Sequence, residues 1–542
     1  MSSTLRSPLR SRLRPSLSSL RRSLRRSLST VVGTAANSPL HSPLTDAAPS
    51  SLRSESTESS DSSQMKRAVA AAIPEKRAAL QSLRRDHAAV PLDTLTVGSV
   101  LGGMRGARAL FWGGTTLSPE QGIRFHGLSI EQCQAQLPGP EILGEGAGES
   151  SPGESADALS PSPQFLPESM LWLLMTGRPP SPAEALSVTR LLNERIESQG
   201  GALPPEVSRA MRALPRDLHP MTQLSVGLSV LQRNSQFARA YEQGKLGKAD
   251  YWAPTYEDAI TLIANLPLLA GEVYSTVQAQ ATGTTPQPLG QWRADRDWSY
   301  NLCSLLGYTA DSANIRGLTA EQQRDFVALM RLYTGIHADH EGGNVSAHTT
   351  HLVGSALADP FLAYAAGANG LAGPLHGLAA QEVVRFLESL QRQLGGEKVT
   401  DSLLSDQLWA LLRAGQVIPG YGHAVLRRAD PRFTAMLRFA QARPAEFGAD
   451  PHVQLMVRLS RVAPAVLREH GRCNNPHPNV DAASGILFHH YGVRELLFFT
   501  VIFACSRALG PLAQLVWDRA YGLPIERPKS VDLGQLMKLA RG

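Results

Sequence analysis

The chain has 542 residues, 42% of them hydrophobic, and a formal charge of +6; this is enough apolar content for a sizeable core in two or three domains. The charge first suggests a nucleic-acid partner, but eight arginines and no acidic residue lie within residues 1–30, so the rest of the chain is close to neutral and offers no electrostatic footprint for nucleic acid. Four widely separated cysteines without a C-x-x-C pair argue against a disulfide scaffold and a cysteine-based zinc site.

Residues 1–64 are predicted to be a leader and a spacer. Leucines recur every three or four residues from Leu5 to Leu28, and on a helix they form one apolar stripe. An Arg- and Ser-rich start with no acidic residue before Asp46 is typical of a mitochondrial or plastid transit peptide. A disordered basic tail or a membrane-surface helix is the alternative. Residues 31–64, rich in Ser, Thr, Pro and Ala, are expected to be a disordered spacer that contains the cleavage site.

From about Met65 onward the pattern predicts one helix after another. Ser181 offers an N-cap, with a proline and a glutamate in the turn that follows. Apolar residues recur at helical intervals in 256–280, 326–336, 383–394, 403–412 and 455–467. The run from Leu496 to Cys505 is too short to cross a bilayer, so a buried helix and no membrane partner are expected. Only 95–101 and 109–112 show the alternation of a short sheet, and residues 138–164 predict an exposed loop insertion.

Four histidines lie between His337 and His351, which first suggests a metal site. They form two pairs, each three residues apart, and each pair shares one face if the segment is helical. The spacing is not that of the helical zinc proteases, because Asn344 stands four residues after His340, and no cysteine supports a site. We therefore predict no metal; most of these histidines are expected to pack helices, and one or two to meet a ligand.

Two turns rich in glycine and proline each present a single histidine. His376 precedes a helix that is predicted to begin near Leu378, where the positive helix end disfavours a charged imidazole. A neutral imidazole N–H there can support a developing enolate oxygen. His423 is followed by three arginines, at 427, 428 and 432, which look like an anion clamp beside a proton donor. In both turns the alternative is an incidental histidine in a solvated loop.

Three charged residues complete the set. Asp481 follows two prolines at the start of a predicted helix, where an aspartate usually serves only as a cap. Arg507 and Arg527 stand beside apolar helix residues, where an unpaired charge is costly. Together these segments supply a general base, two imidazoles and several arginines, which are the groups that enolisation beside a dianion requires.

The strings G-L-A-G-P-L-H-G and P-G-Y-G-H-A-V-L-R, in this order, closely resemble citrate synthase of the eukaryotic mitochondrial type, and the resemblance runs from about Leu92 to Lys529. It implies an all-α enzyme of the mitochondrial matrix that joins acetyl-CoA to oxaloacetate and hydrolyses citryl-CoA. No cofactor is implied, since acetyl-CoA is a co-substrate. By similarity, Asp481 takes a proton from the thioester methyl, His376 hydrogen-bonds the enol oxygen and His423 polarises the ketone of oxaloacetate.

The resemblance also implies the substrate contacts and the assembly. The residues that match the family's oxaloacetate contacts are His340, His423, Arg432, Arg507 and Arg527. The last of these reaches in from the other subunit, so a homodimer is implied. The residues that fall where CoA phosphates are expected are Arg105, Lys248, Arg427 and Arg472, with Lys248 in place of an arginine and Arg472 in place of a lysine.

The family fold has a large domain and a smaller one that closes over the substrates. Transferred to this chain, 65–378 and 487–542 form the large domain and 379–486 the small one, bracketed by His376 and Asp481. Acid and base then meet only on closure, which excludes water until the carbon–carbon bond is made.

Three alternatives stay open. A 2-methylcitrate synthase uses propionyl-CoA, and one methylene in an apolar pocket discriminates by only ~1–3 kcal/mol. A non-catalytic homologue would lack a member of the catalytic triplet, and all three members are present. A histidine-cluster metalloprotein predicts stoichiometric metal in the purified protein.

Overall fold

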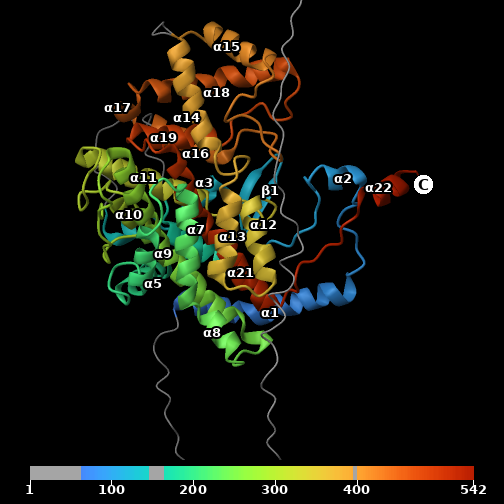
Figure 1. Cartoon of the computed structure of the whole chain (residues 1–542). Coiled ribbons are helices and arrows are strands. Elements are labelled where there is room, and N and C mark those ends of the chain that lie inside the picture. The colour runs from blue at the N-terminus through green and yellow to red at the C-terminus, as the bar shows by residue number, and fades with distance from the viewer. Residues whose placement is uncertain (1–62, 146–163, 395–398, 542) are drawn as a thin grey trace, which may run out of the picture. The chain divides into compact units, whose positions relative to one another are not determined.

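The structure, a computed structural model, describes residues 63–145, 164–394 and 399–541. The predicted leader and nearly all of the spacer (1–62), and most of the predicted loop insertion (146–163), lie outside the described residues. What is described is almost entirely helical (Figure 1), and this confirms the predicted all-α class.

The helices of the first half lead to one long helix. They are α1 (Gln64–Asp86), α2 (Val97–Leu101), α3 (Ile130–Gln136), α4 (Pro167–Thr176), α5 (Pro182–Glu197), α6 (Pro205–Arg212), α7 (Pro220–Leu231), α8 (Gln236–Glu242) and α9 (Trp252–Thr282), with 3-10 turns η1 (Pro140–Leu143), η2 (Gln232–Asn234) and η3 (Lys248–Asp250).

The second half continues with shorter helices. They are α10 (Trp298–Leu305), α11 (Ala320–Ile336), α12 (Val345–Ser355), α13 (Pro360–Leu371), α14 (Ala379–Gln393), α15 (Asp401–Arg413), α16 (Pro431–Gln441), α17 (Pro444–Phe447), α18 (Pro451–His470), α19 (Asp481–His490), η4 (Leu496–Phe498), α20 (Phe499–Arg507), α21 (Leu509–Tyr521) and α22 (Leu533–Ala540). The predicted apolar stretches 256–280, 326–336, 403–412 and 455–467 each fall in one of these helices. The stretch 383–394 ends one residue past α14, and 496–505 covers η4 and most of α20.

Helix α9 is the centre of the core. It contacts α5, α7, α8, α10, α13, α20 and α21, and apolar residues on every side of it are buried, as expected of a helix enclosed by others. Two stretches, Lys248–Thr282 and Leu496–Tyr521, are long and apolar enough to cross a membrane, but 83% of each apolar window is buried inside the protein. Both are core helices, as predicted for the run that begins at Leu496.

Local capping explains where several helices begin. Ser181 accepts from the amide of Glu184 while Glu184 accepts from the amide of Ser181, which confirms the predicted N-cap of α5. A capping box of the same kind explains why one of the predicted strands is wrong. Residues 95–101 do not form a strand, because Thr96 and Ser99 make a capping box that starts α2.

The second predicted strand, 109–112, is also wrong, because that segment is irregular. The sheet of the described residues is instead the antiparallel hairpin of β1 (Thr115–Ser118) and β2 (Gly122–Phe125), which pairs Thr115 with Phe125. The turn between the strands has Gly122 at φ 76°, a conformation that favours glycine.

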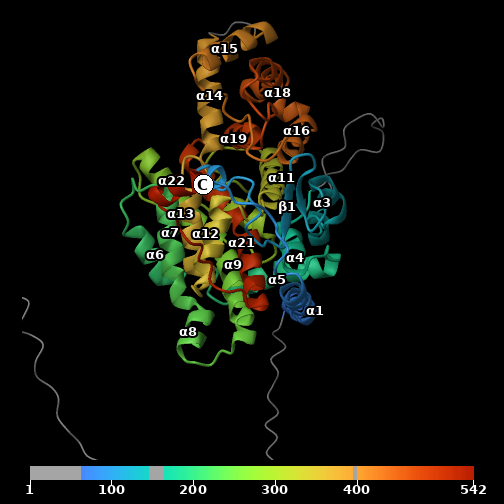
Figure 2. The same ribbon diagram turned by 90° about the vertical axis from the view of Figure 1, so that its right-hand side faces the viewer.

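Helices α14 to α19 contact one another and lie together in two perpendicular views (Figures 1 and 2). Helix α16 also contacts α3 and α11. This group spans the segment 379–486 that the resemblance assigns to a small domain; the boundaries of that domain stay a prediction.

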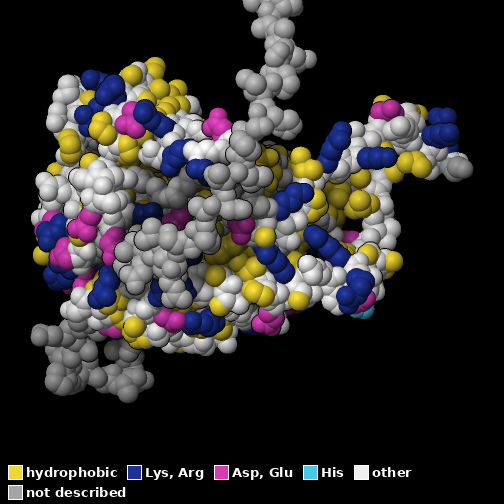
Figure 3. Space-filling model, turned by 90° about the horizontal axis from the view of Figure 1, so that it is seen from below, with side chains coloured by type: hydrophobic (Ala, Val, Ile, Leu, Met, Phe, Trp, Pro, Cys, Tyr) yellow, Lys and Arg dark blue, Asp and Glu magenta, His cyan; other side chains and the backbone are white. Residues whose placement is uncertain are grey.

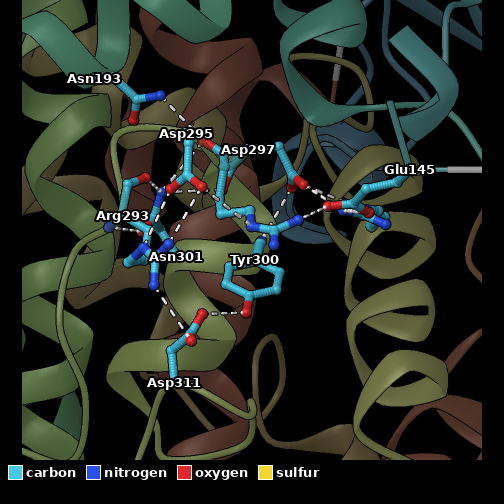
Figure 4. A network of polar contacts seen from close by, with 10 residues as sticks. Glu145, Asn193, Arg293, Asp295, Asp297, Tyr300, Asn301 and Asp311 are labelled. Atoms are coloured by element: carbon cyan, nitrogen blue, oxygen red, sulfur yellow. Dashed lines mark hydrogen bonds and ion pairs between the residues drawn. The ribbon is translucent and has the colours of Figure 1, made fainter. Parts of the chain in front are cut away.

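A polar network joins α10 and α11 to the start of the predicted insertion (Figure 4). Asp297 caps α10 and accepts from Arg331 Nε at 3.1 Å, while Arg331 Nη2 donates to Glu145 at 2.7 Å. The Arg331 side chain is buried, and both of its partners are carboxylates.

Candidate active site

Hydrogen bonds join the loop that carries His423 to the loop that precedes Asp481. The amide of Asn479 donates to Gly420 O at 2.9 Å, and the amide of Gly422 donates to His477 O at 3.3 Å. Two segments more than fifty residues apart are thus held together immediately before α19, whose first residue is Asp481.

Asp481 is a half-buried carboxylate whose side chain has no hydrogen-bond or ion-pair partner in the described residues. Burial raises the pKa of Asp481 to about 6, against the opposing effect of the nearby Arg432 and Arg507. A carboxylate with a raised pKa and free oxygens is suited to accept a proton near neutral pH. The predicted helix start is confirmed.

The ring nitrogens of His423 have different roles. Nδ1 accepts from the amides of Val425 and Leu426, both at 3.0 Å, so the ring proton lies on Nε2. Burial, reinforced by Arg432, lowers the pKa of His423 to about 4 and keeps the ring neutral. The ring centroid of His340 lies 5.6 Å away. His423 therefore keeps one free N–H donor, on Nε2, for a ligand.

His376 has the opposite tautomer. Its Nε2 accepts from the amide of Ser346 at 3.3 Å and lies 2.9 Å from the hydroxyl of the same residue, so the proton is on Nδ1. Burial is the largest cause that lowers the pKa of His376 to about 4, and Arg507 adds to it. The predicted neutral imidazole before α14 agrees with this direction, although burial rather than the helix end is the main cause.

Of the three arginines expected to form an anion clamp, only Arg432 is buried. Its Nε and Nη2 donate to Asp430 at 3.1 and 2.7 Å, which leaves Nη1 free to bind a second anion. Arg427 and Arg428 are exposed, and Arg427 bonds the carbonyls of residues 424–426. Because the chain turns into α16 after Asp430, it carries Arg432 inward and leaves the other two arginines at the surface, and the clamp of three stays a prediction.

Arg507 is 1% exposed and forms no ion pair within the described residues, although the buried Asp339 lies near enough for its charge to raise the pKa of Arg507. Its Nε donates to His337 O at 3.0 Å and its Nη1 to Asn344 Oδ1 at 3.2 Å, and both acceptors are neutral. Burial lowers the pKa of Arg507 to about 10, so it is still charged at neutral pH. His340 Nε2 is buried nearby without a hydrogen-bond partner in the described residues. An unpaired buried cation beside an orphaned imidazole nitrogen indicates an anionic ligand.

The remaining predicted site residues are not joined to this cluster. Within the described residues no hydrogen bond or ion pair links the cluster to the exposed cations Arg105, Lys248, Arg427, Arg472 and Arg527. The residue next to the last of them, Glu526, pairs with His348 at 2.9 Å.

Sequence reasoning missed three residues that orient this site. Asp430 holds Arg432, Asn344 holds Arg507, and Ser346 fixes the tautomer of His376. Asn344 and Asp430 are also N-caps, of α12 and α16. Their position just before a helix could be found in the sequence, but a cap does not reveal a second contact across the fold.

The four histidines of 337–351 do not form one cluster. His348 and His351 lie on α12, as predicted for a helical pair, and face Glu526 and Asp518. For His337 and His340 the shared helix face is wrong, because α11 ends at Ile336. His337 stacks on Tyr333 with ring centroids 3.9 Å apart. No group of three or more His, Cys, Asp or Glu side chains in the described ranges could hold a metal ion.

Comparisons with known proteins agree on one family. Residues 103–529 match the family described as citrate synthase, C-terminal domain. The chain is 52% identical over 479 residues to mitochondrial citrate synthase 3 of Saccharomyces cerevisiae, covering 88% of this chain and 93% of the relative. It is 48% identical over 474 residues to mitochondrial 2-methylcitrate synthase of Aspergillus fumigatus, covering 88% and 93%.

A solved structure shares the fold. The crystal structure of citrate synthase from Pyrobaculum aerophilum matches with a TM-score of 0.63 at 22% identity, covering 82% of this chain and 97% of that one. The extent of the family match and the identity to full-length relatives lead to one conclusion: the chain belongs to the citrate synthase family.

Proposed function

We propose that this enzyme condenses acetyl-CoA with oxaloacetate and hydrolyses citryl-CoA to citrate and CoA, the entry step of the tricarboxylic acid cycle. The observation that carries the proposal is Arg507, a guanidinium 1% exposed whose hydrogen bonds to His337 and Asn344 go to neutral oxygens and which forms no ion pair in the described residues. Arg432 is near enough for its charge to lower the pKa of Arg507, and its Nη1 is not used in the bonds to Asp430. Two such cations suit the two carboxylates of oxaloacetate, and His340 Nε2 supplies a further polar contact.

The steps follow from the protonation states. Asp481 removes a proton from the methyl carbon of acetyl-CoA, and His376 Nδ1–H donates to the thioester oxygen as negative charge develops there. The carbon then attacks the ketone of oxaloacetate, whose oxygen is polarised by His423 Nε2–H. Water finally cleaves the thioester of citryl-CoA and releases the CoA thiol. Exclusion of water before carbon–carbon bond formation is the purpose of a closing 379–486 domain.

For CoA we propose the exposed cations as phosphate ligands: Arg105, Lys248, Arg427 and Arg472. Exposure is compatible with this role, because the nucleotide end of CoA is highly charged and stays near solvent. The proposal needs no metal and no cofactor beyond acetyl-CoA as co-substrate.

The direct test is release of free CoA thiol on mixing oxaloacetate with acetyl-CoA in the presence of a chelator. Thiol release that depends on both substrates, and citrate identified as the product, is expected. Absence of thiol release from folded protein, or a requirement for added metal, contradicts the proposal.

A second candidate, 2-methylcitrate synthase, is favoured by the 48% identical relative of that name. It uses the same residues with propionyl-CoA in place of acetyl-CoA, and the extra methylene changes the transition-state free energy by only ~1–3 kcal/mol. Initial rates with the two thioesters separate the candidates, and a preference for propionyl-CoA favours the second.

We further propose a homodimer, with Arg527 contributed across the interface. Helix α22 has no buried residue, and its apolar side chains Leu533 and Leu539 are 73% and 68% exposed. Leu92 and Leu101, before and within α2, are 72% and 71% exposed. Figure 3 shows hydrophobic side chains on the projecting part of the surface at its right, where α2 and α22 lie in Figure 1. Apolar surface of this extent favours a protein partner.

Co-expression of two inactive variants tests the exchange of Arg527. A dimer of one Arg527→Ala chain and one Asp481→Ala chain regains one complete site if Arg527 acts on the partner's site. If Arg527 acts within its own chain, neither site is complete and no activity returns.

We propose the mitochondrial matrix as the location. The arginine- and serine-rich start at residues 1–30 and relatives that carry mitochondrial names support this. Residues 1–64 fused to a fluorescent protein test it; the fusion should enter the matrix, and plastid import or a cytosolic fusion protein contradicts it.

A further inference from the structure

A cavity lies among α1, α4 and α21. It has a volume of about 110 Å³ and is lined by side chains from α1, α4, α21 and the segment after β2. The side chains with polar or aromatic groups are Lys76, His126, Gln514, Trp517 and Tyr521. None of the residues proposed for oxaloacetate, CoA or catalysis lines it.

Lys76 is the cation of this cavity. Its Nζ lies 4.0 Å from the centroid of the Trp517 ring. In the described part of the chain it donates no hydrogen bond and has no ion-pair partner, although burial lowers the pKa of its ammonium. His126 lies opposite, with Nε2 3.4 Å from Leu174 O. A side chain added at Gly177 would meet both groups, which places them close together.

No acidic side chain lines the cavity. Two carboxylates next to its lining residues, Asp518 and Asp339, already have partners. Asp518 pairs with His351 at 2.8 Å and accepts from Gln514 at 2.8 Å. Asp339 accepts from Trp112 and Thr115, both at 2.8 Å. The carboxylate whose charge acts on Lys76 is that of the adjacent Glu75, which is exposed to solvent and forms no ion pair with Lys76 in the described residues.

We propose that this cavity binds a small monocarboxylate, with Lys76 as its charged contact. One ammonium is a point charge that suits a single carboxylate. The rest of the lining includes Leu174, Ala513 and the Trp517 ring, which suit a short apolar chain. Phosphate or sulfate, which needs polar donors on all sides, fits this half-apolar lining less well.

The position of the cavity places its occupant near the oxaloacetate contacts without overlap. Gly114 and Gly510 line the cavity, and a side chain at either position would touch Asp339. Asp339 in turn accepts from the amide of His340 at 2.9 Å. The two sites are thus separated by one buried aspartate.

Trifluoroacetate is a suitable probe, since it is a small carboxylate whose ¹⁹F resonance reports binding. The full chain is titrated with oxaloacetate at saturation, so that the substrate contacts are occupied. Saturable broadening is expected for the unmodified protein. Lys76→Gln should weaken binding at least about tenfold, because a charge-assisted contact is lost, and Lys76→Arg should retain it.

Two further variants make the result specific. Arg84→Gln removes one positive charge from an exposed position of the same helix and should leave binding unchanged. Ala513→Val narrows the cavity while it keeps Lys76, and should weaken binding. The turnover of Lys76→Gln should be unchanged, so this test is independent of the proposed catalytic chemistry.

Three results overturn the proposal. The first is no saturable binding when oxaloacetate is present. The second is equal binding by Lys76→Gln and the unmodified protein, each shown to be folded by circular dichroism. The third is displacement of trifluoroacetate by an equal concentration of inorganic phosphate, which would mean that the cavity binds anions without the proposed carboxylate selectivity.

Discussion

Two buried arginines in this protein have opposite surroundings. Arg331 forms ion pairs with Asp297 and Glu145, and these two carboxylates neutralise its charge. Arg507 is even less exposed, yet in the described residues it forms no ion pair: it donates to a carbonyl and an amide oxygen and lies over the Phe503 ring. Because a buried charge is costly unless it is paired, the first arginine is satisfied by the fold and the second is left for a ligand.

Two aspartates show the same contrast. Asp297 caps α10 and pairs with Arg331, so both of its roles are structural. Asp481 stands at the start of α19 but has no side-chain partner in the described residues, and burial raises its pKa to about 6. An aspartate at a helix start can therefore be assigned a role only from its surroundings. A side chain that caps the helix is structural, and one without a partner is a candidate base.

The largest expected effect is on turnover. Asp481→Ala should lower kcat by about 10²–10⁴-fold, the contribution of a positioned general base, while oxaloacetate binding stays largely intact. Steady-state kinetics and calorimetric titration of oxaloacetate measure the two quantities. Near-normal turnover in this variant would show that Asp481 is not the base.

The second prediction separates the arginines by stability. Arg331→Met should lower the free energy of unfolding by about 3–5 kcal/mol, because the buried Asp297 remains without an ion-pair partner, while Glu145 keeps Arg296. Arg507→Met breaks no ion pair of the described residues and should lower it less, while it weakens oxaloacetate binding. Urea unfolding of both variants makes the comparison, and equal losses of stability would remove the distinction.

The third effect is on affinity. Arg432→Ala removes one guanidinium from the proposed oxaloacetate contacts, and a charge-assisted hydrogen bond contributes about 1.5–3 kcal/mol. The dissociation constant of oxaloacetate should rise by roughly 10- to 150-fold. Arg428→Ala, at an exposed position four residues earlier, is the matched control and should bind as the unmodified protein does. Unchanged affinity in Arg432→Ala would remove this contact.

The smallest effect is a pH dependence. Asp481 acts as a base only when it is ionised, and its pKa is raised to about 6. Activity should therefore be full above this pH and fall about tenfold per unit well below it, as the carboxylate takes up a proton. His376 and His423, with pKa values lowered to about 4, stay neutral throughout this range. A pH–rate profile that is flat from pH 7 to 5 would contradict this assignment.

Much of the architecture could be predicted because its causes are local. The reciprocal bonds of Ser181 and Glu184 span three residues, and the glycines around His376 and His423 force turns wherever the chain carries them. The predicted strand at 95–101 failed for an equally local reason. The alternation was visible, but the capping box of Thr96 and Ser99 starts a helix there.

The sequence by itself determined the helices, the two histidine turns and the family. Only the tertiary structure decided which charges have partners: Arg432 forms an ion pair with Asp430, whereas Arg507 forms no ion pair in the described residues. It also decided that His376 and His423 carry their protons on different nitrogens. Finally, it decided that Lys76 lies close to His126. The reason is physical. A helix cap depends on neighbours a few positions away, whereas ion pairing and burial depend on groups brought within a few ångströms from anywhere in the chain.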